Sequence, residues 1–187
     1  MKNNKMIAMM LTMSMLAAAF AGCLGGDDED DTPDWSISMA SDVSADFVES
    51  AWDPIIPNLN AGDMCDAIIS AMTKTDEREQ AVDFTRAYYT SSQGVIGGSG
   101  AASISAVADL NAEGTTIGVQ SGTTSDLYAQ DNLGAATISA YDDFPSVIAA
   151  LNNGDVHYAM GDAPVLSLEG DLMVTFSDEN FGMAVQG

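Results

Sequence analysis

The regular alternation of short apolar runs with amphipathic stretches most constrains what this chain can fold into. Strand-like runs lie at residues 116–120, 136–140 and 156–160, and helix-like stretches follow the first two, one of them after Ser125. In the second helix-like stretch, apolar residues fall at positions i, i+3, i+4 and i+7, namely Phe144, Val147, Ile148 and Leu151. Strands that alternate with helices of this length predict β–α–β units and a largely parallel sheet.

Earlier in the chain the same alternation continues with shorter elements. The pattern predicts a helix from Thr75 to Val82, with Thr75 as its cap, and an extended crossing between two lobes over residues 91–100. Strands are predicted at 35–40, 47–50 and 66–70, and further helices at 53–60 and near 104–110.

The first 22 residues have the pattern of a targeting segment. Two lysines lie within residues 1–5, and residues 6–22 carry no ionisable side chain, as in the n-region and h-region of a secretory signal. The run ends in Phe20-Ala21-Gly22-Cys23, which resembles the lipobox of prokaryotic lipoproteins and implies cleavage and lipidation at Cys23. The alternative is an uncleaved anchor helix with an incidental cysteine. Either reading places the remaining residues outside the cytoplasmic membrane, and a lipidated Cys23 leaves Cys65 as a buried, unpaired thiol.

Acidic residues dominate the charge of the chain. Twenty-eight Asp and Glu face five Lys and Arg, for a net charge of −23. This charge repels phosphate backbones, so we exclude nucleic acid as a partner. Residues 25–34 hold six acids and no apolar surface to bury, which predicts a solvated tether. After cleavage the only basic residues are Lys74, Arg78 and Arg86.

Three polar loops lie where strands are expected to end, at residues 70–78, 120–125 and 161–164. Arg78 offers a planar fork of donors for a carboxylate, unless it forms a surface ion pair. Residues 120–125 can turn amides and hydroxyls toward an anion, unless the hydroxyls only cap a helix. Asp162 can accept an ammonium group, unless it is a helix N-cap. Together these groups describe a site for a zwitterion, an α-amino acid.

Several motifs follow one another in a set order along the chain. They are Trp52–Pro57, Cys65–Arg78, Val82–Phe84 and Tyr88–Tyr89, and then Ile117–Thr124, Ala149–Leu151, Gly161–Pro164 and Phe181–Val185. The first four resemble the first lobe of the polar amino-acid binding proteins of ABC importers, solute-binding family 3; the next three resemble its second lobe, and the last resembles its returning hinge strand. The resemblance runs from about residue 47 to residue 187 and implies an α/β, two-lobed periplasmic-binding-protein-like fold of type II.

Carried over residue by residue, the resemblance implies a set of ligand contacts. Arg78 clamps the α-carboxylate, helped by the Thr73 hydroxyl and the Thr124 amide. Asp162 and the carbonyl of Ala71 take the α-ammonium. Trp52 is the wall against which the ligand side chain lies. Gln120 stands where some family members have a residue that selects this side chain, and Thr123, from the same loop, completes the implied ligand-binding set. A tryptophan that only fills the core is the ordinary alternative for Trp52.

The resemblance further implies a lipid-anchored receptor that captures an amino acid and docks on an ABC permease, with no cofactor and no catalytic residue. An extracytoplasmic dehydratase of arogenate or prephenate on a similar fold is the alternative, and so is a truncated relative that binds nothing. His157 lies on an apolar strand and is expected to be structural. The sequence contains no metal-ligand spacing, Ser-His-Asp set or Gly-rich phosphate loop.

The expected organisation is a signal peptide (1–22), an acidic tether (23–34), a partial first lobe (35–92), a second lobe (93–180) and a returning hinge strand (181–187). Family members ordinarily have an aromatic loop and a helix between the first strand and the position of Trp52. Here residues 35–50 hold at most two strands, and the sequence stops at the hinge strand. We therefore expect the first lobe to lack part of its cover.

Overall fold

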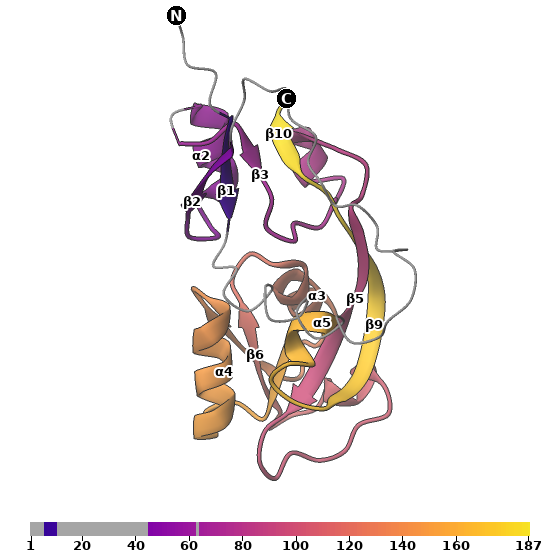
Figure 1. The fold of residues 1–187 in the computed structure, drawn as a ribbon. Helices are drawn as coiled ribbons and strands as arrows, with labels where there is room; N and C mark the ends of the chain where they lie inside the picture. The colour runs from indigo at the N-terminus through magenta and orange to yellow at the C-terminus, as the bar shows by residue number, and fades with distance from the viewer. Residues whose placement is uncertain (1–5, 11–44, 63) are drawn as a thin grey trace, which may run out of the picture.

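The computed structural model describes residues 6–10, 45–62 and 64–187, with the backbone alone at residues 6–10. Two five-stranded sheets lie one above the other in Figure 1, and two long strands, β5 (Tyr89–Gly97) and β9 (Leu172–Phe181), run from the lower sheet toward the upper one. The predicted two-lobed α/β fold is confirmed. The extended crossing predicted at residues 91–100 corresponds to β5.

The first lobe is built on a sheet in the order β2-β1-β3-β10-β4. One helix, α2 (Ile55–Ala61), packs on it and ends at Gly62, whose φ of 71° is the left-handed conformation that glycine adopts readily. Cys65 is buried in the core of this lobe, as predicted, and burial raises the pKa of its thiol. The strands are β1 (Met6–Met10), β2 (Ala45–Glu49), β3 (Ala67–Ile68), β4 (Val82–Phe84) and β10 (Ala184–Gln186).

Strand β1 lies within the segment predicted to be a signal peptide. Its backbone pairs in parallel with β2 on one side and with β3 on the other. Cleavage at Cys23 would therefore remove a central strand of this sheet. Cys23 itself, the acidic tether and the strand predicted at 35–40 lie outside the described residues, so these stay predictions.

The second lobe is built on a sheet in the order β7-β6-β8-β5-β9. Strand β6 pairs in parallel with β7 and β8, whereas β5 runs antiparallel to β8 and β9. The sheet is therefore mixed rather than largely parallel, because β5, which enters it from the first lobe, runs opposite to both β8 and β9. Its elements are β6 (Thr116–Gln120), α3 (Thr124–Asn132), β7 (Thr137–Tyr141), α4 (Phe144–Asn153), β8 (Tyr158–Asp162) and α5 (Ala163–Leu166).

Two predicted helices are wrong in type or length. The helix expected from Thr75 to Val82 is a single 3-10 turn, η1 (Arg78–Gln80), because Val82 already belongs to β4, which pairs with β10. The helix expected near residues 104–110 is also a short 3-10 turn, η2 (Val107–Leu110). No helix in the part of the chain that the structure describes is long and apolar enough to cross a membrane.

Candidate functional site

The three polar loops meet between the two lobes. Arg78, from the loop after β3, donates from Nη2 to the carbonyl of Gly122 in the turn between β6 and α3, at 3.3 Å. Asp162, at the end of β8, and Thr124, at the start of α3, both bind the same amide group of Gln93. The carboxyl ends of β3, β6 and β8 therefore contribute to one site, as expected for an α/β sheet.

Arg78 is held by backbone carbonyls and by an aromatic ring. Its Nη1 donates to the carbonyl of Thr73 at 2.9 Å, and its Cζ lies 5.2 Å from the centre of the Trp52 ring. Burial lowers the pKa of the guanidinium, while the charges of Glu179 and Asp162 raise it. The alternative of a surface ion pair does not hold among the described residues, where it is Lys74 that pairs with a carboxylate.

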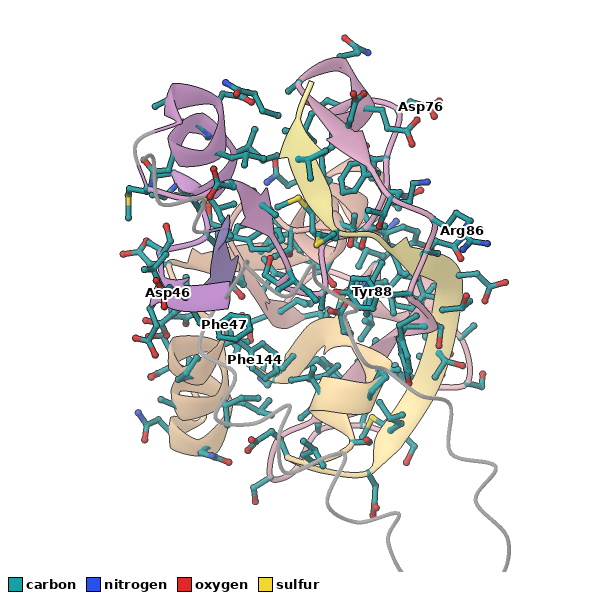
Figure 2. The ribbon with its side chains drawn as sticks, turned by 45° about the horizontal axis from the view of Figure 1, so that its top comes forward. Asp46, Phe47, Asp76, Arg86, Tyr88 and Phe144 are labelled. Atoms are coloured by element: carbon teal, nitrogen blue, oxygen red, sulfur yellow. The ribbon has the colours of Figure 1, made fainter. Side chains whose placement is uncertain are left out.

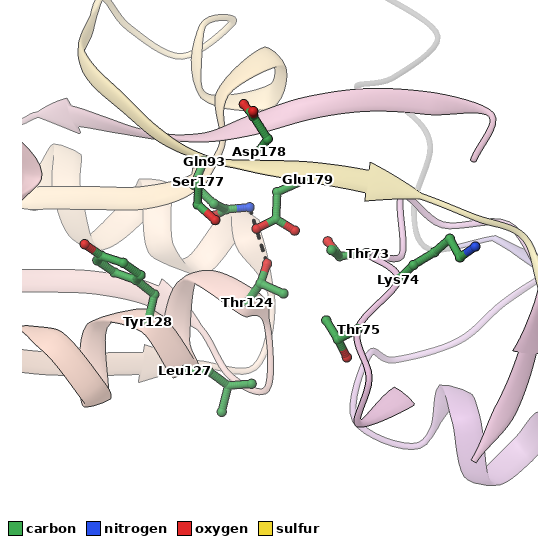
Figure 3. Close-up of a pocket in the computed structure, with 10 residues that line it drawn as sticks. All are labelled: Thr73, Lys74, Thr75, Gln93, Thr124, Leu127, Tyr128, Ser177, Asp178 and Glu179. Carbon is green, nitrogen blue, oxygen red and sulfur yellow. Dashed lines mark hydrogen bonds between the residues drawn. The ribbon is translucent and has the colours of Figure 1, made fainter. Parts of the chain in front are cut away.

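The other two basic residues of the described chain direct their charged groups elsewhere. Lys74 is part of the lining of the cavity in Figure 3, but its side chain extends away from the other lining residues and lies 3.8 Å from Glu79. Arg86 is exposed at the edge of the molecule in Figure 2, whereas Tyr88 lies toward its middle. Arg78 is thus the cation positioned to meet a ligand between the lobes.

Asp162 ends β8 in a position that suits an acceptor for an ammonium group. Its carboxylate accepts a hydrogen bond from Gln93 Nε2 at 2.7 Å. Burial raises the pKa of Asp162 to about 6 and the charge of Glu179 adds to the rise, against Gln93 and Arg78, which lower it. Asp162 precedes α5 but makes no side-chain capping bond, so the alternative of a helix N-cap does not account for it.

In the turn before α3, one hydroxyl group caps the helix and other groups face the site. Thr123 accepts from the amide of Asp126 and donates to the carbonyl of Gln120, so its hydroxyl caps the helix. Thr124 instead directs its hydroxyl to Gln93. The side chain of Gln120 donates to the carbonyl of Asp142 at 3.4 Å. Thr123 and Gln120 therefore already have partners away from Arg78, whereas Gly122 and Thr124 face the site.

The loop after β3 has an unusual backbone at Ala71, whose φ is 52°. The amide of Ala71 donates to the Tyr88 hydroxyl at 2.9 Å, and burial raises the pKa of that phenol. Farther along the loop, Thr73 forms a bridge with Phe181, and the Lys74 amide donates to Asn180. This loop is therefore fastened directly to the end of β9.

Sequence reasoning missed two polar residues of the site. Gln93, on β5, is 1% exposed and links Asp162, Thr124 and Ser125. Glu179, on β9, is 4% exposed, and its Oε2 has no hydrogen-bond partner among the described residues. The buried hydroxyl of Ser70, at the end of the β3 segment, also lacks one. Gln93 and Glu179 lie within crossing strands, where a polar residue in an alternating pattern is ordinarily read as solvent-facing.

Two cavities flank the site. One, of about 300 Å³, opens between α3, β9 and the Thr73 loop, and most of the residues that line it are polar (Figure 3). The other, of about 250 Å³, lies beside Trp52, Met72 and Arg78. Among the described residues no group of three or more His, Cys, Asp or Glu side chains could hold a metal ion. His157 contacts Thr116 through Nδ1.

The chain is similar to several curated proteins. It is 29% identical over 163 residues to a probable histidine-binding protein of Neisseria gonorrhoeae, covering 81% of this chain and 60% of that protein. It is 35% identical over 121 residues to ABC transporter arginine-binding protein 1 of Escherichia coli, covering 65% of this chain and 48% of that protein. The chain thus spans about half the length of these relatives.

Solved structures share the fold over nearly the whole chain. An ancestral amino-acid-binding protein, AncCDT-1, a precursor of cyclohexadienyl dehydratase, matches with a TM-score of 0.78 and 26% identity, covering 99% of this chain and 83% of that one. An ancestral arginine-binding protein bound to glutamine matches with a TM-score of 0.75 and 26% identity, covering 100% and 85%. The model of the bacterial extracellular solute-binding proteins, family 3, matches residues 36–140. With this match and the type II periplasmic-binding-protein fold, the chain belongs to the bacterial extracellular solute-binding proteins of family 3.

Proposed function

We propose that the protein captures an amino acid between its two lobes and delivers it to an ABC importer. The observation that carries this proposal is the placement of one guanidinium, Arg78, and one carboxylate, Asp162, on opposite lobes of the same site. A zwitterion presents the complementary pair of charges. The names of similar proteins, which bind histidine and arginine, support the same class of ligand.

In this proposal Arg78 holds the α-carboxylate, with the Thr73 hydroxyl and the Thr124 amide as further donors. Asp162 and the carbonyl of Ala71 receive the α-ammonium. Charge-assisted hydrogen bonds of this kind are about twice as strong as neutral ones. Trp52, which already lies against the Arg78 guanidinium, forms a wall of the site.

Ligand capture has to rearrange one contact between the lobes. The hydrogen bond from Arg78 to the Gly122 carbonyl spans 3.3 Å across the site, and a bound carboxylate competes for the same Nη2 group. The ligand therefore takes the place of a direct contact between the lobes and couples them through its own charges. Closure then excludes water from these ion pairs and strengthens them.

Calorimetry of the full chain in detergent micelles against a panel of standard amino acids tests the proposal. Arg78→Ala should weaken the tightest binding by about 10-fold to 150-fold, since hydrogen bonds to charged groups contribute roughly 1.5–3 kcal/mol. Arg86→Ala is the matched control, because it removes the same charge from the exposed edge. Folded protein that binds no amino acid, or equal affinity in the Arg78→Ala variant, would show that the site is wrong.

A dehydratase is a second candidate, favoured by one observation. Such an enzyme needs a proton donor for a leaving hydroxyl group beside a carboxylate clamp, and burial raises the pKa of both Asp162 and Glu179 near Arg78. Turnover of arogenate or prephenate by the full chain, abolished in Asp162→Asn or Glu179→Gln, would support this candidate. Binding of amino acids without turnover supports the receptor.

For localisation we propose a lipid anchor at Cys23 facing the periplasm or the cell exterior. The lysines before the apolar run and the small residues before Cys23 support this proposal. Mass spectrometry of the membrane-extracted protein should find a chain that begins at a lipid-modified Cys23, and Cys23→Ala should abolish the modification. An unmodified chain that still carries residues 6–10 would contradict the anchor and would keep β1 in its sheet.

A further inference from the structure

A buried carboxylate on the hinge strand has no place in the clamp for the amino-acid backbone. Glu179 is 4% exposed, and its Oε2 has no hydrogen-bond partner among the described residues. The side chain lines the cavity of about 300 Å³ and lies in Figure 3 between Thr73 and Thr124. A carboxylate oxygen withdrawn from water without a partner is costly, so its retention here points to a partner that arrives with the ligand.

An irregularity of β9 turns Glu179 into the cavity. The register with β5 shifts so that Gln93 pairs with Phe176 and Ser92 pairs with Asp178, which leaves Ser177 as an extra residue. Ser177 has a φ of 49°, a left-handed conformation that is strained for serine. Before this bulge, Phe176 faces α3 and contacts Tyr128; after it, Glu179 is the buried residue and Asp178 is exposed. Bulges commonly re-aim a side chain in this way.

The charges around the site do not balance when a zwitterion is bound. Arg78 supplies one positive charge, and Asp162 and Glu179 supply two negative charges when both are ionised. A zwitterion adds one charge of each sign and leaves one excess negative charge beside the buried Glu179. Lys74 and Asp178 also line this cavity, and their charges cancel. Lys74 moreover lies 3.8 Å from Glu79, so it does not supply the missing cation. A ligand with one further positive charge would restore neutrality.

The groups around Glu179 suit a cation with several donors. The hydroxyls of Thr73 and Thr124 lower the pKa of this carboxyl, and Gln93, Ser177 and Asp178 also line the cavity. These groups offer acceptor oxygens in a space of about 300 Å³, at the lower end of the range for small-molecule sites. A guanidinium or ammonium group can satisfy such a set, and an aliphatic side chain cannot.

We propose that this cavity receives the cationic side chain of an amino acid, with Glu179 as its counter-ion. The inference rests on the proposed function and names the class of ligand for that site. Glu179 thereby determines specificity, while Arg78 and Asp162 bind the groups common to all amino acids.

The test compares L-arginine with L-citrulline, which has the same length and a neutral urea in place of the guanidinium. Calorimetry of the full chain should give at least tenfold tighter binding of arginine. Glu179→Gln should reduce this ratio to less than threefold, mainly by weakening arginine, while Glu179→Asp should keep arginine preferred. The matched control is Glu113→Gln, the same change at an exposed loop position remote from the cavity, which should preserve the ratio. Thermal unfolding confirms that each variant is folded.

The possible results distinguish a failure of the proposed role of Glu179 from a failure of the proposed amino-acid receptor. Equal or tighter binding of citrulline by the wild-type chain overturns the role of Glu179 while the amino-acid receptor stands, and this result does not depend on any variant folding. An unchanged ratio in folded Glu179→Gln also overturns it. Binding of no amino acid at all overturns the proposed function and the specificity together.

Discussion

If the proposed site is right, Asp162 should make amino-acid binding depend on pH. In the ligand-free protein burial raises its pKa from 3.8 to about 6, although the Gln93 amide and the Arg78 charge favour the ionised form. Only the ionised carboxylate attracts an α-ammonium. At pH 7.5 nearly all molecules carry the ionised form, whereas at pH 5 about ten are protonated for each ionised one. We therefore expect affinity to fall roughly tenfold between pH 7.5 and pH 5.

Calorimetry with the tightest-binding amino acid at pH 7.5, 6 and 5 measures this effect. The Asp162→Asn variant should bind weakly at every pH and keep only the part of the pH dependence that comes from Glu179, whose pKa burial also raises. Wild-type affinity that stays within a factor of two down to pH 5 would refute the role of Asp162.

As pH falls, the contribution of Asp162 to the stability of the ligand-free protein should increase, whereas its contribution to ligand affinity should decrease. A carboxyl whose pKa is about 6 when folded and 3.8 when unfolded binds more protons in the folded state, so its contribution to stability increases as pH falls through 6 toward 4. The ionised group costs at most about 3 kcal/mol at pH 7. Urea unfolding should therefore show Asp162→Asn more stable than wild type at pH 7 and the gap closing by pH 4. A gap that does not vary with pH would contradict the assignment.

Three further substitutions test the fold and the site. Ile117→Ala removes a fully buried side chain from the second lobe and should cost about 2–5 kcal/mol of unfolding free energy, measured in urea; a loss below about 1 kcal/mol would mean that the core collapses around it. Thr123→Ala removes the N-cap of α3 and should cost about 1 kcal/mol in the same assay, and no change would show that the cap is dispensable. Trp52→Leu removes the ring 5.2 Å from the Arg78 guanidinium and should weaken amino-acid binding about threefold to tenfold by calorimetry, whereas unchanged binding would confine Trp52 to the core.

The spacing of apolar residues correctly predicted the elements whose apolar side chains are buried at regular intervals along the chain. Helix α4 has its apolar stripe at helical spacing, and Gly154 ends it with a φ of 81°. Strand β6 occupies residues 116–120, as expected. Periodicity succeeds there because burial on one face of a helix, or within a sheet, repeats along the chain.

Prediction failed where distant strands decided the local structure. Residues 75–82 have a capping threonine and acids in a first turn, yet only Arg78–Gln80 forms a 3-10 turn. Residues 82–84 pair instead with β10, about 100 residues later in the chain. Hydrogen bonds of a sheet and burial of Val82 outweigh a weak helical propensity.

The sequence by itself predicted which loops carry the proposed site and that Arg78, one of five basic residues, is the group suited to an anion. It also determined the family, through motifs in a set order. Only the tertiary structure decided that Gln93 links Asp162 to Thr124 and that Glu179 faces the cavity. The physical reason is the bulge at Ser177, because a one-residue change in register between two strands reverses which side chains face inward, and no local pattern reports that register.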